Sequence, residues 1–140
     1  MIYQVFDIDN TLVDFGGVTP YPNVLNHINS LDLNDNRLIF LTARYDLNRN
    51  WTQNFLKETL GHENFTLVCR EMVEMSIPRY KLKSIKVLFN ESPQELHFYD
   101  DDPENLRFVD YYRKKYNIEN IFLYLAHNGI LNRIPYSFNF

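Results

Sequence analysis

Two aspartates, Asp7 and Asp9, directly follow the apolar run Ile2–Phe6 near the start of this 140-residue chain. Residues i and i+2 of an extended segment point the same way, so both carboxylates are expected to face one spot. Two like charges held that close are unfavourable unless a positive group joins them. Mg²⁺, which takes one or two carboxylates together with phosphate and water oxygens, is the expected partner.

A second acidic cluster, Asp100, Asp101 and Asp102, follows the apolar run Leu96–Tyr99. Each cluster alone has a structural explanation, because Asp before Pro103 is typical of a helix N-cap and the first cluster of a turn. Two clusters that each end a buried-looking strand together favour a metal site. Which of the three later aspartates bind the metal stays open, with the N-cap favoured for Asp102.

A hydroxyl and an amine complete a set of groups suited to phosphate chemistry. Thr42 ends the apolar stretch LIFLTARY, and PRYKLKSIK supplies Lys81 and Lys83. Phosphoryl transfer depends mainly on positioning and on neutralising charge, so a carboxylate nucleophile, a metal, a hydroxyl donor and a lysine are the parts it needs. Both lysines remain candidates; Lys81 is favoured because the apolar residues that follow it, such as Leu82, then pack inward at the start of a helix.

Elements that could bring these residues together are visible as alternating strand and helix patterns. Most of the apolar runs are continuous, as expected for strands buried on both faces of a parallel sheet. Stripes at helical spacing fall between them, which predicts an α/β fold: a doubly wound, mainly parallel, five-stranded Rossmann-like sheet with helices on both faces. In such sheets ligands bind at the carboxyl ends of the strands. The expected strands are Ile2–Phe6, Leu38–Leu41, Phe65–Cys69, Leu96–Tyr99 and Ile121–Leu125, and the expected helices are Asn23–Leu31, Leu47–Leu60, Lys81–Phe89 and Pro103–Tyr116.

Composition limits the class of protein. The length predicts one domain over 1–140, and 45% hydrophobic residues are typical of a globular chain. A net charge of −4 argues weakly against a dedicated nucleic-acid-binding module. Cys69 is the only cysteine, so no intrachain disulfide can form. No basic residue precedes Asp7 and no apolar stretch nears membrane-span length, so a cytoplasmic protein without a membrane is expected.

In order along the chain, DIDNT, LTAR, Lys81 and YDDD resemble the four motifs of the haloacid dehalogenase superfamily, over roughly Val5 to Asp102. The resemblance implies a Mg²⁺-dependent phosphatase in which Asp7 is the nucleophile that forms an aspartyl-phosphate. It implies that Asp9 protonates the leaving oxygen and then activates water. Thr42 and Lys81 would hold the phosphoryl group.

The same resemblance implies the other contacts of the site. Asp100 and Asp101 would complete the Mg²⁺ site, together with Asp7 and the backbone carbonyl of Asp9. The residues expected to bind substrate are Asn10, Thr11, Ala43 and Arg44. Asn10 stands where glycine is often found, and asparagine tolerates the positive φ of such a turn.

The substrate is left open by the sequence. No segment is long enough for a separate cap domain, which predicts an open site and a large substrate, or one gripped only by its phosphate. LTAR weakly resembles the 3′-phosphatase domain of polynucleotide kinases, which favours a polynucleotide end. The stretch Cys69–Phe89 holds five basic and two acidic residues. This excess of positive charge is either a patch that binds a polyanion or an ordinary solvated face.

Other functions remain as alternatives. One is a 5′-nucleotidase or another small-molecule phosphatase, and another is a catalytically idle relative that serves as a binding protein. A receiver-type signalling domain is disfavoured because the run Phe65–Cys69 has no aspartate at its end. The aromatic end, with Tyr136, Phe138 and Phe140, could dock on the domain or on a second subunit, so a homo-oligomer stays open.

Overall fold

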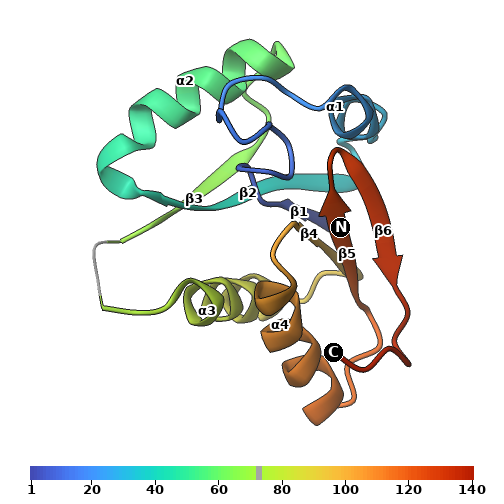
Figure 1. The fold of residues 1–140 in the computed structure, drawn as a ribbon. Helices are drawn as coiled ribbons and strands as arrows, with labels where there is room; N and C mark the ends of the chain where they lie inside the picture. The colour runs from blue at the N-terminus through green and yellow to red at the C-terminus, as the bar shows by residue number, and fades with distance from the viewer. Residues whose placement is uncertain (72–73) are drawn as a thin grey trace.

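The protein folds around one six-stranded sheet. The structure is a computed structural model that describes residues 1–71 and 74–140 (Figure 1). The strand order is β3-β2-β1-β4-β5-β6; β1 to β5 run parallel and β6 pairs antiparallel with β5. The strands are β1 (Ile2–Phe6), β2 (Asn36–Tyr45), β3 (Thr66–Arg70), β4 (Glu95–Asp100), β5 (Ile121–His127) and β6 (Ile130–Ile134).

The predicted α/β class and mainly parallel sheet are confirmed, but the expected count of five strands is wrong. The sixth strand, β6, has no buried residue, and Asn132 and Arg133 interrupt its apolar residues, so it lacks the continuous apolar run expected of a central strand. Asn128 and Gly129 join it to β5, and both have positive φ, 49° and 79°. Asn-Gly is a strong sequence signal for a hairpin, because both residues accept this backbone conformation.

The helices cover the sheet in two pairs. They are α1 (Pro22–Asn29), α2 (Arg49–Leu60), α3 (Ile77–Phe89) and α4 (Pro103–Lys115), with a 3₁₀ turn η1 (Asp46–Asn48) before α2. Figure 1 shows α1 and α2 above the sheet and α3 and α4 below it. Neighbouring residues of β1 pack into separate hydrophobic cores on the two faces of the sheet. Val5 packs with residues of α3 and α4, and Phe6 packs with residues of α1 and α2.

Two element boundaries that affect the site differ from the expectation. The helix α3 begins at Ile77, with Pro78 in its first turn, so Lys81 lies one turn inside the helix and does not start it. The strand β2 continues past Leu41 to Tyr45, with an irregular register against β3 in that interval. Irregular pairing of this kind re-aims side chains, and the interval carries Thr42 and Arg44.

The C-terminal aromatic segment packs on its own chain. Tyr136 covers the Arg113 guanidinium, whose carbon lies 4.9 Å from the ring centroid, and Lys114 donates to the carbonyl oxygen of Phe138. The segment therefore docks against α4, as the end of the chain does in Figure 1. No helix in the described part of the chain combines the length and hydropathy that a bilayer crossing requires.

Candidate active site

The carboxyl ends of the three central strands bring the predicted residues together. In the sheet order β1 lies between β2 and β4, and Phe6 is in register with both Phe40 and Tyr99. The pairing continues one residue further, because the Asp7 amide donates to the Tyr99 carbonyl at 2.9 Å. Asp7 and Asp100 therefore leave adjacent strands at the same edge of the sheet.

Three carboxylates converge at this edge. Asp7, Asp100 and Asp101 each offer an oxygen, and these oxygens lie within 4.8 Å of one another. Asp7 and Asp100 are buried and Asp101 is half-buried. Clustered carboxylate oxygens are the ligands that hard divalent cations prefer, so these three residues could hold a metal ion. The Asp9 side chain does not belong to this cluster.

Lys81 supplies the positive charge inside the cluster. Its ammonium donates to Asp7 Oδ1 at 2.8 Å, to Asp100 Oδ2 at 3.1 Å and to the Leu41 carbonyl at 2.8 Å. These contacts use all three donors of the ammonium, which is almost completely buried. The alternative lysine, Lys83, is exposed on α3. The structure therefore places Lys81, and not Lys83, beside the aspartates.

The electrostatics of the cluster favour an additional cation. Burial, followed by the negative charge of Asp100, raises the pKa of Asp7 well above its usual range, although Lys81 opposes the shift. Burial also raises the pKa of Asp101. Burial alone would lower the pKa of Lys81, but Asp100 and Asp7 outweigh it and raise that pKa. One lysine therefore does not balance the three carboxylates, and a divalent cation would.

Asp100 is fixed by contacts that the sequence did not reveal. Asn105 Nδ2 lies 3.2 Å from both Asp100 oxygens, and the Asp102 amide donates to Asp100 Oδ1 at 2.9 Å. Asn105 is buried in the first turns of α4, but an asparagine five residues after an aspartate carries no recognisable signal. The Asp102 side chain accepts from the Glu104 amide at 2.9 Å, which confirms the N-cap interpretation.

The turn after β1 orients Asp7. Thr11 is fully buried, and its hydroxyl donates to Asp7 Oδ2 at 3.1 Å. The amides of Thr11 and Leu12 fold back onto the Ile8 carbonyl, and Asn10 takes the left-handed conformation with φ 61°. Both Asp7 oxygens are therefore held, one by Thr11 and the other by Lys81. The contact expected between Thr11 and substrate is in this structure a contact with Asp7.

Thr42 follows Leu41 in β2, and the Leu41 carbonyl accepts from Lys81. Its side chain is fully buried, and its hydroxyl oxygen accepts from the Arg44 amide at 3.1 Å. The hydroxyl proton stays available to donate, as phosphate binding requires. Ala43, between them, is half-buried.

The carboxylate of Asp9 is bound by Arg44. Arg44 Nε lies 3.0 Å from Asp9 Oδ2 and Nη2 lies 2.8 Å from Oδ1, and Nη2 also donates to the Gly17 carbonyl at 3.2 Å. A pair of parallel bonds of this kind fixes both the position and the orientation of a carboxylate. Arg44, expected at the substrate, thus also links the loop around Gly17 to the first motif.

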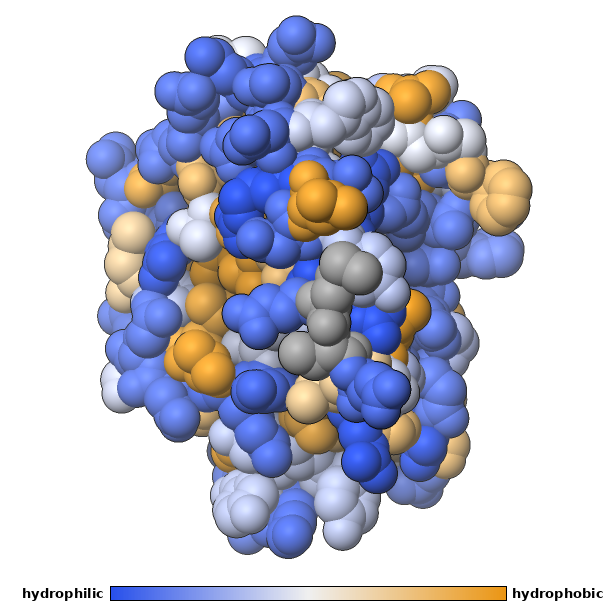
Figure 2. All heavy atoms as spheres, turned by 90° about the vertical axis from the view of Figure 1, so that its left-hand side faces the viewer, coloured by the Kyte–Doolittle hydropathy of each residue, from blue (hydrophilic) through white to orange (hydrophobic). Residues whose placement is uncertain are grey.

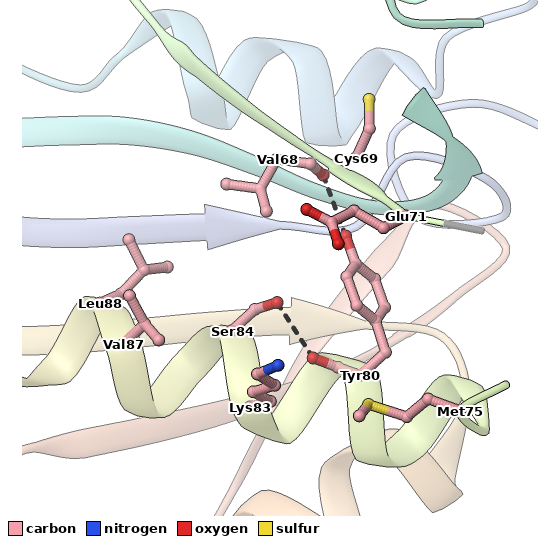
Figure 3. Close-up of a pocket in the computed structure, with 9 residues that line it drawn as sticks. All are labelled: Val68, Cys69, Glu71, Met75, Tyr80, Lys83, Ser84, Val87 and Leu88. Atoms are coloured by element: carbon pink, nitrogen blue, oxygen red, sulfur yellow. Dashed lines mark hydrogen bonds between the residues drawn. The ribbon is translucent and has the colours of Figure 1, made fainter. Parts of the chain in front are cut away.

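A separate apolar cavity of about 240 Å³ lies between β3 and α3 (Figure 3). Tyr80 crosses it; burial raises the pKa of Tyr80 to about 12, and its hydroxyl donates to the Thr42 carbonyl at 2.8 Å. Among the described residues that line it, none belongs to the acidic cluster. Figure 2 shows that this side of the molecule is mostly hydrophilic, with apolar side chains in separate patches.

The basic stretch on this side gives mixed evidence. Arg79 and Lys83 are exposed, whereas Arg70 donates to the Met75 carbonyl and lies over the Tyr45 ring. The stretch is therefore not uniformly free for a polyanion.

Comparison of the chain with protein-family models, with curated proteins and with solved structures finds no match.

Proposed function

We propose that this protein is a Mg²⁺-dependent phosphomonoesterase that acts through an aspartyl-phosphate, in the manner of the haloacid dehalogenase superfamily. One observation carries the proposal. The oxygens of Asp7, Asp100 and Asp101 lie within 4.8 Å of one another, and Lys81 bonds to Asp7 at 2.8 Å. A nucleophile, a lysine and a metal-ligand set thus meet at the sheet edge where α/β folds bind ligands.

The oxygen ligands fit Mg²⁺, and the pKa of Asp7 is raised by burial and then by the negative charge of Asp100, both of which a bound cation would offset. When bound, Mg²⁺ would reduce the charge repulsion between Asp7 and the incoming phosphate and would withdraw negative charge from the phosphoryl oxygens. The ligands would be the carboxylates of Asp7, Asp100 and Asp101, with the Asp9 backbone carbonyl as the further expected donor. Lys81 and the Thr42 hydroxyl would hold the phosphoryl group.

The proposed reaction has two displacements at phosphorus. In the first, an oxygen of Asp7 bonds to phosphorus, the ester P–O bond breaks, and Asp9 gives its proton to the leaving alkoxide. In the second, Asp9 takes a proton from water, whose oxygen attacks phosphorus. The Asp7–phosphate bond breaks, inorganic phosphate leaves, and both carboxylates return to their initial state.

The position of Asp9 suits this double role. It lies two residues after Asp7, and 46% of its side chain is exposed, so a leaving group can reach it. The two bonds from Arg44 limit its rotation, and one Asp9 oxygen must leave its Arg44 donor in order to carry the proton of the first displacement. We infer that Arg44 is a positioning residue for the acid, beside any contact that it makes with substrate.

A phosphatase assay with and without Mg²⁺ tests the proposal. The substrates are a simple alkyl phosphate, mononucleotides and oligonucleotides with a 3′- or 5′-terminal phosphate, so that the polynucleotide and nucleotidase alternatives are separated. Asp7→Asn keeps the size of the side chain but removes the nucleophile, and it is expected to abolish turnover of every substrate. The matched control is Asp35→Asn, at an exposed aspartate outside the site, which should keep wild-type rates.

Two results would contradict the proposal. Turnover by Asp7→Asn would remove the nucleophile assignment. Absence of turnover by the wild-type protein with every ester, combined with Mg²⁺ binding, would favour the idle binding protein.

A further inference from the structure

A hollow of about 430 Å³ lies next to the Asp9–Arg44 pair, outside the acidic cluster. Two residues that line it also approach Asp9. Arg44 binds the Asp9 carboxylate, and a Cβ added at Gly17 would lie 3.5 Å from Asp9 Oδ1. The hollow therefore adjoins the acid of the proposed reaction, where the remainder of a phosphate ester would lie.

One wall of the hollow is an exposed aromatic surface. Trp51, on the first turn of α2, leaves 56% of its surface exposed. Its ring is held in place, because it stacks on Phe55 with an interplanar angle of 3° and a centroid separation of 5.8 Å. The Arg44 guanidinium lies over part of the ring, with its carbon 5.3 Å from the Trp51 centroid, and 56% of the residue's surface stays exposed. A fixed ring beside a cation is suited to stacking with another flat, electron-rich ring.

Polar side chains also line the hollow. Arg44 Nη1 and Thr52 Oγ1 are buried, and neither has a hydrogen-bond partner within residues 1–71 and 74–140. Thr52 is fully buried, and it lines the hollow together with Arg44 and the amide-bearing Asn48. The reachable polar groups of the hollow are the exposed amide of Asn48 and the remaining donors of Arg44, and these suit a ligand with a polar edge.

We propose that this hollow is a nucleobase subsite, so that the phosphatase acts on a phosphorylated nucleotide, either free or at the end of a single strand. The base stacks on the exposed part of Trp51, its polar edge meets Asn48 or Arg44, and the phosphate of the nucleotide lies at Asp7. Stacking on an aromatic side chain next to an arginine is how proteins hold unpaired bases. This proposal rests on the proposed function for the identity of the phosphate site.

Trp51 is the only tryptophan, so its fluorescence reports directly on the subsite. Asp7→Asn protein with Mg²⁺ is titrated with a nucleoside monophosphate, with ribose 5-phosphate and with a 3′-phosphorylated oligothymidylate, under excitation beyond the absorption of the bases. We expect quenching by the nucleotide or the oligonucleotide but not by ribose 5-phosphate, and the stronger quencher identifies the source of the base. Absence of quenching by both base-containing probes overturns the proposal.

Kinetics of the wild-type protein provide a second test that does not depend on that variant. The measured quantity is the ratio of kcat/KM for the nucleoside monophosphate to that for ribose 5-phosphate. We expect Trp51→Ala to lower this ratio about tenfold or more, and Trp51→Phe to lower it less, because a phenyl ring still stacks. The control is Tyr111→Ala, at an exposed aromatic residue of α4 remote from the hollow, which should leave the ratio unchanged.

The two proposals fail in different ways. A wild-type ratio near one, with both substrates hydrolysed, overturns the nucleobase subsite and leaves the phosphatase standing. Absence of hydrolysis of either substrate contradicts the phosphatase, and the fluorescence titration then decides the subsite by itself.

Discussion

The Arg44 guanidinium holds the Asp9 carboxylate through two hydrogen bonds, 3.0 Å from Nε and 2.8 Å from Nη2. Lysine cannot reproduce this geometry, so Arg44→Lys is expected to release Asp9 while keeping the charge. We predict that kcat/KM for glycerol phosphate falls about a hundredfold, the lower end of the roughly 10²–10⁴-fold contribution of a positioned acid. The value for p-nitrophenyl phosphate should fall less, because its phenolate leaves without a proton.

The control for this prediction is Arg107→Lys. Arg107 also makes two bonds to one carboxylate, that of Glu104, but on the exposed surface of α4. Arg107→Lys should leave kcat/KM unchanged for both glycerol phosphate and p-nitrophenyl phosphate. Equal losses with the two esters in Arg44→Lys would mean that Arg44 does not act through the acid.

Removal of the buried lysine should destabilise the fold. Lys81→Met leaves the carboxylates of Asp7 and Asp100 buried and without their cation, which typically costs about 3–5 kcal/mol of unfolding free energy. Lys83→Met, at the exposed position of the same helix, should change it by no more than about 0.5 kcal/mol. Denaturant unfolding at neutral pH measures both, and equal stability of the two variants would contradict the central role of Lys81.

Magnesium should stabilise the protein more at neutral pH than at acid pH. The pKa values of Asp7 and Asp101 are raised in the fold, so these groups bind more protons folded than unfolded. Their contribution to stability is therefore fully present below the unfolded pKa of about 4 and is lost as the pH rises through the raised values. Mg²⁺ binds the charged carboxylates and offsets this loss.

The measurement is thermal unfolding with and without Mg²⁺ at both pH values. At about a hundredfold excess over its Kd, Mg²⁺ should add about 2.7 kcal/mol at neutral pH. Asp101→Asn should reduce the gain, whereas Asp35→Asn, outside the cluster, should not. A gain of the same size at both pH values would show that the ion does not bind these carboxylates.

Asp102 should matter for the stability of α4 and not for the metal. Its side chain accepts from the Glu104 amide at 2.9 Å, so Asp102→Ala is expected to lower the unfolding free energy by about 1 kcal/mol. The thermal gain produced by Mg²⁺ should stay at its wild-type value. Loss of that gain in Asp102→Ala would place a third residue of the later cluster among the metal ligands.

Local signals predicted those parts of the fold that depend on burial. The strand Ile2–Phe6 has the predicted bounds because an uninterrupted apolar run at the centre of a parallel sheet has few alternatives. The five expected strands do not include β6, because Asn132 and Arg133 interrupt its apolar residues; the signal that marks this strand is the Asn128-Gly129 turn before it. The helix α3 begins before the expected Lys81 because Pro78 is accepted in its first turn.

The candidate site shows the same division. Convergence of Asp7 and Asp100 follows from strand order alone, since parallel strands end at a common edge. The contacts of Asp9 with Arg44 and of Asn105 with Asp100 depend on side-chain rotation after the backbone is in place. No spacing in the sequence encodes such rotations. The sequence therefore indicates which residues matter but not which residues they contact.

The separation of Asp7 from Lys81, 74 residues along the chain, ties the chemistry to completion of the fold. The strand β1 lies between β2 and β4 in the sheet, and both β4 and the helix α3 that carries Lys81 follow it in the chain. A chain that ends before Asp100 therefore carries Asp7, the proposed nucleophile, without one of its two buried charged neighbours. We therefore expect hydrolysis only from a chain that includes both Lys81 and Asp100.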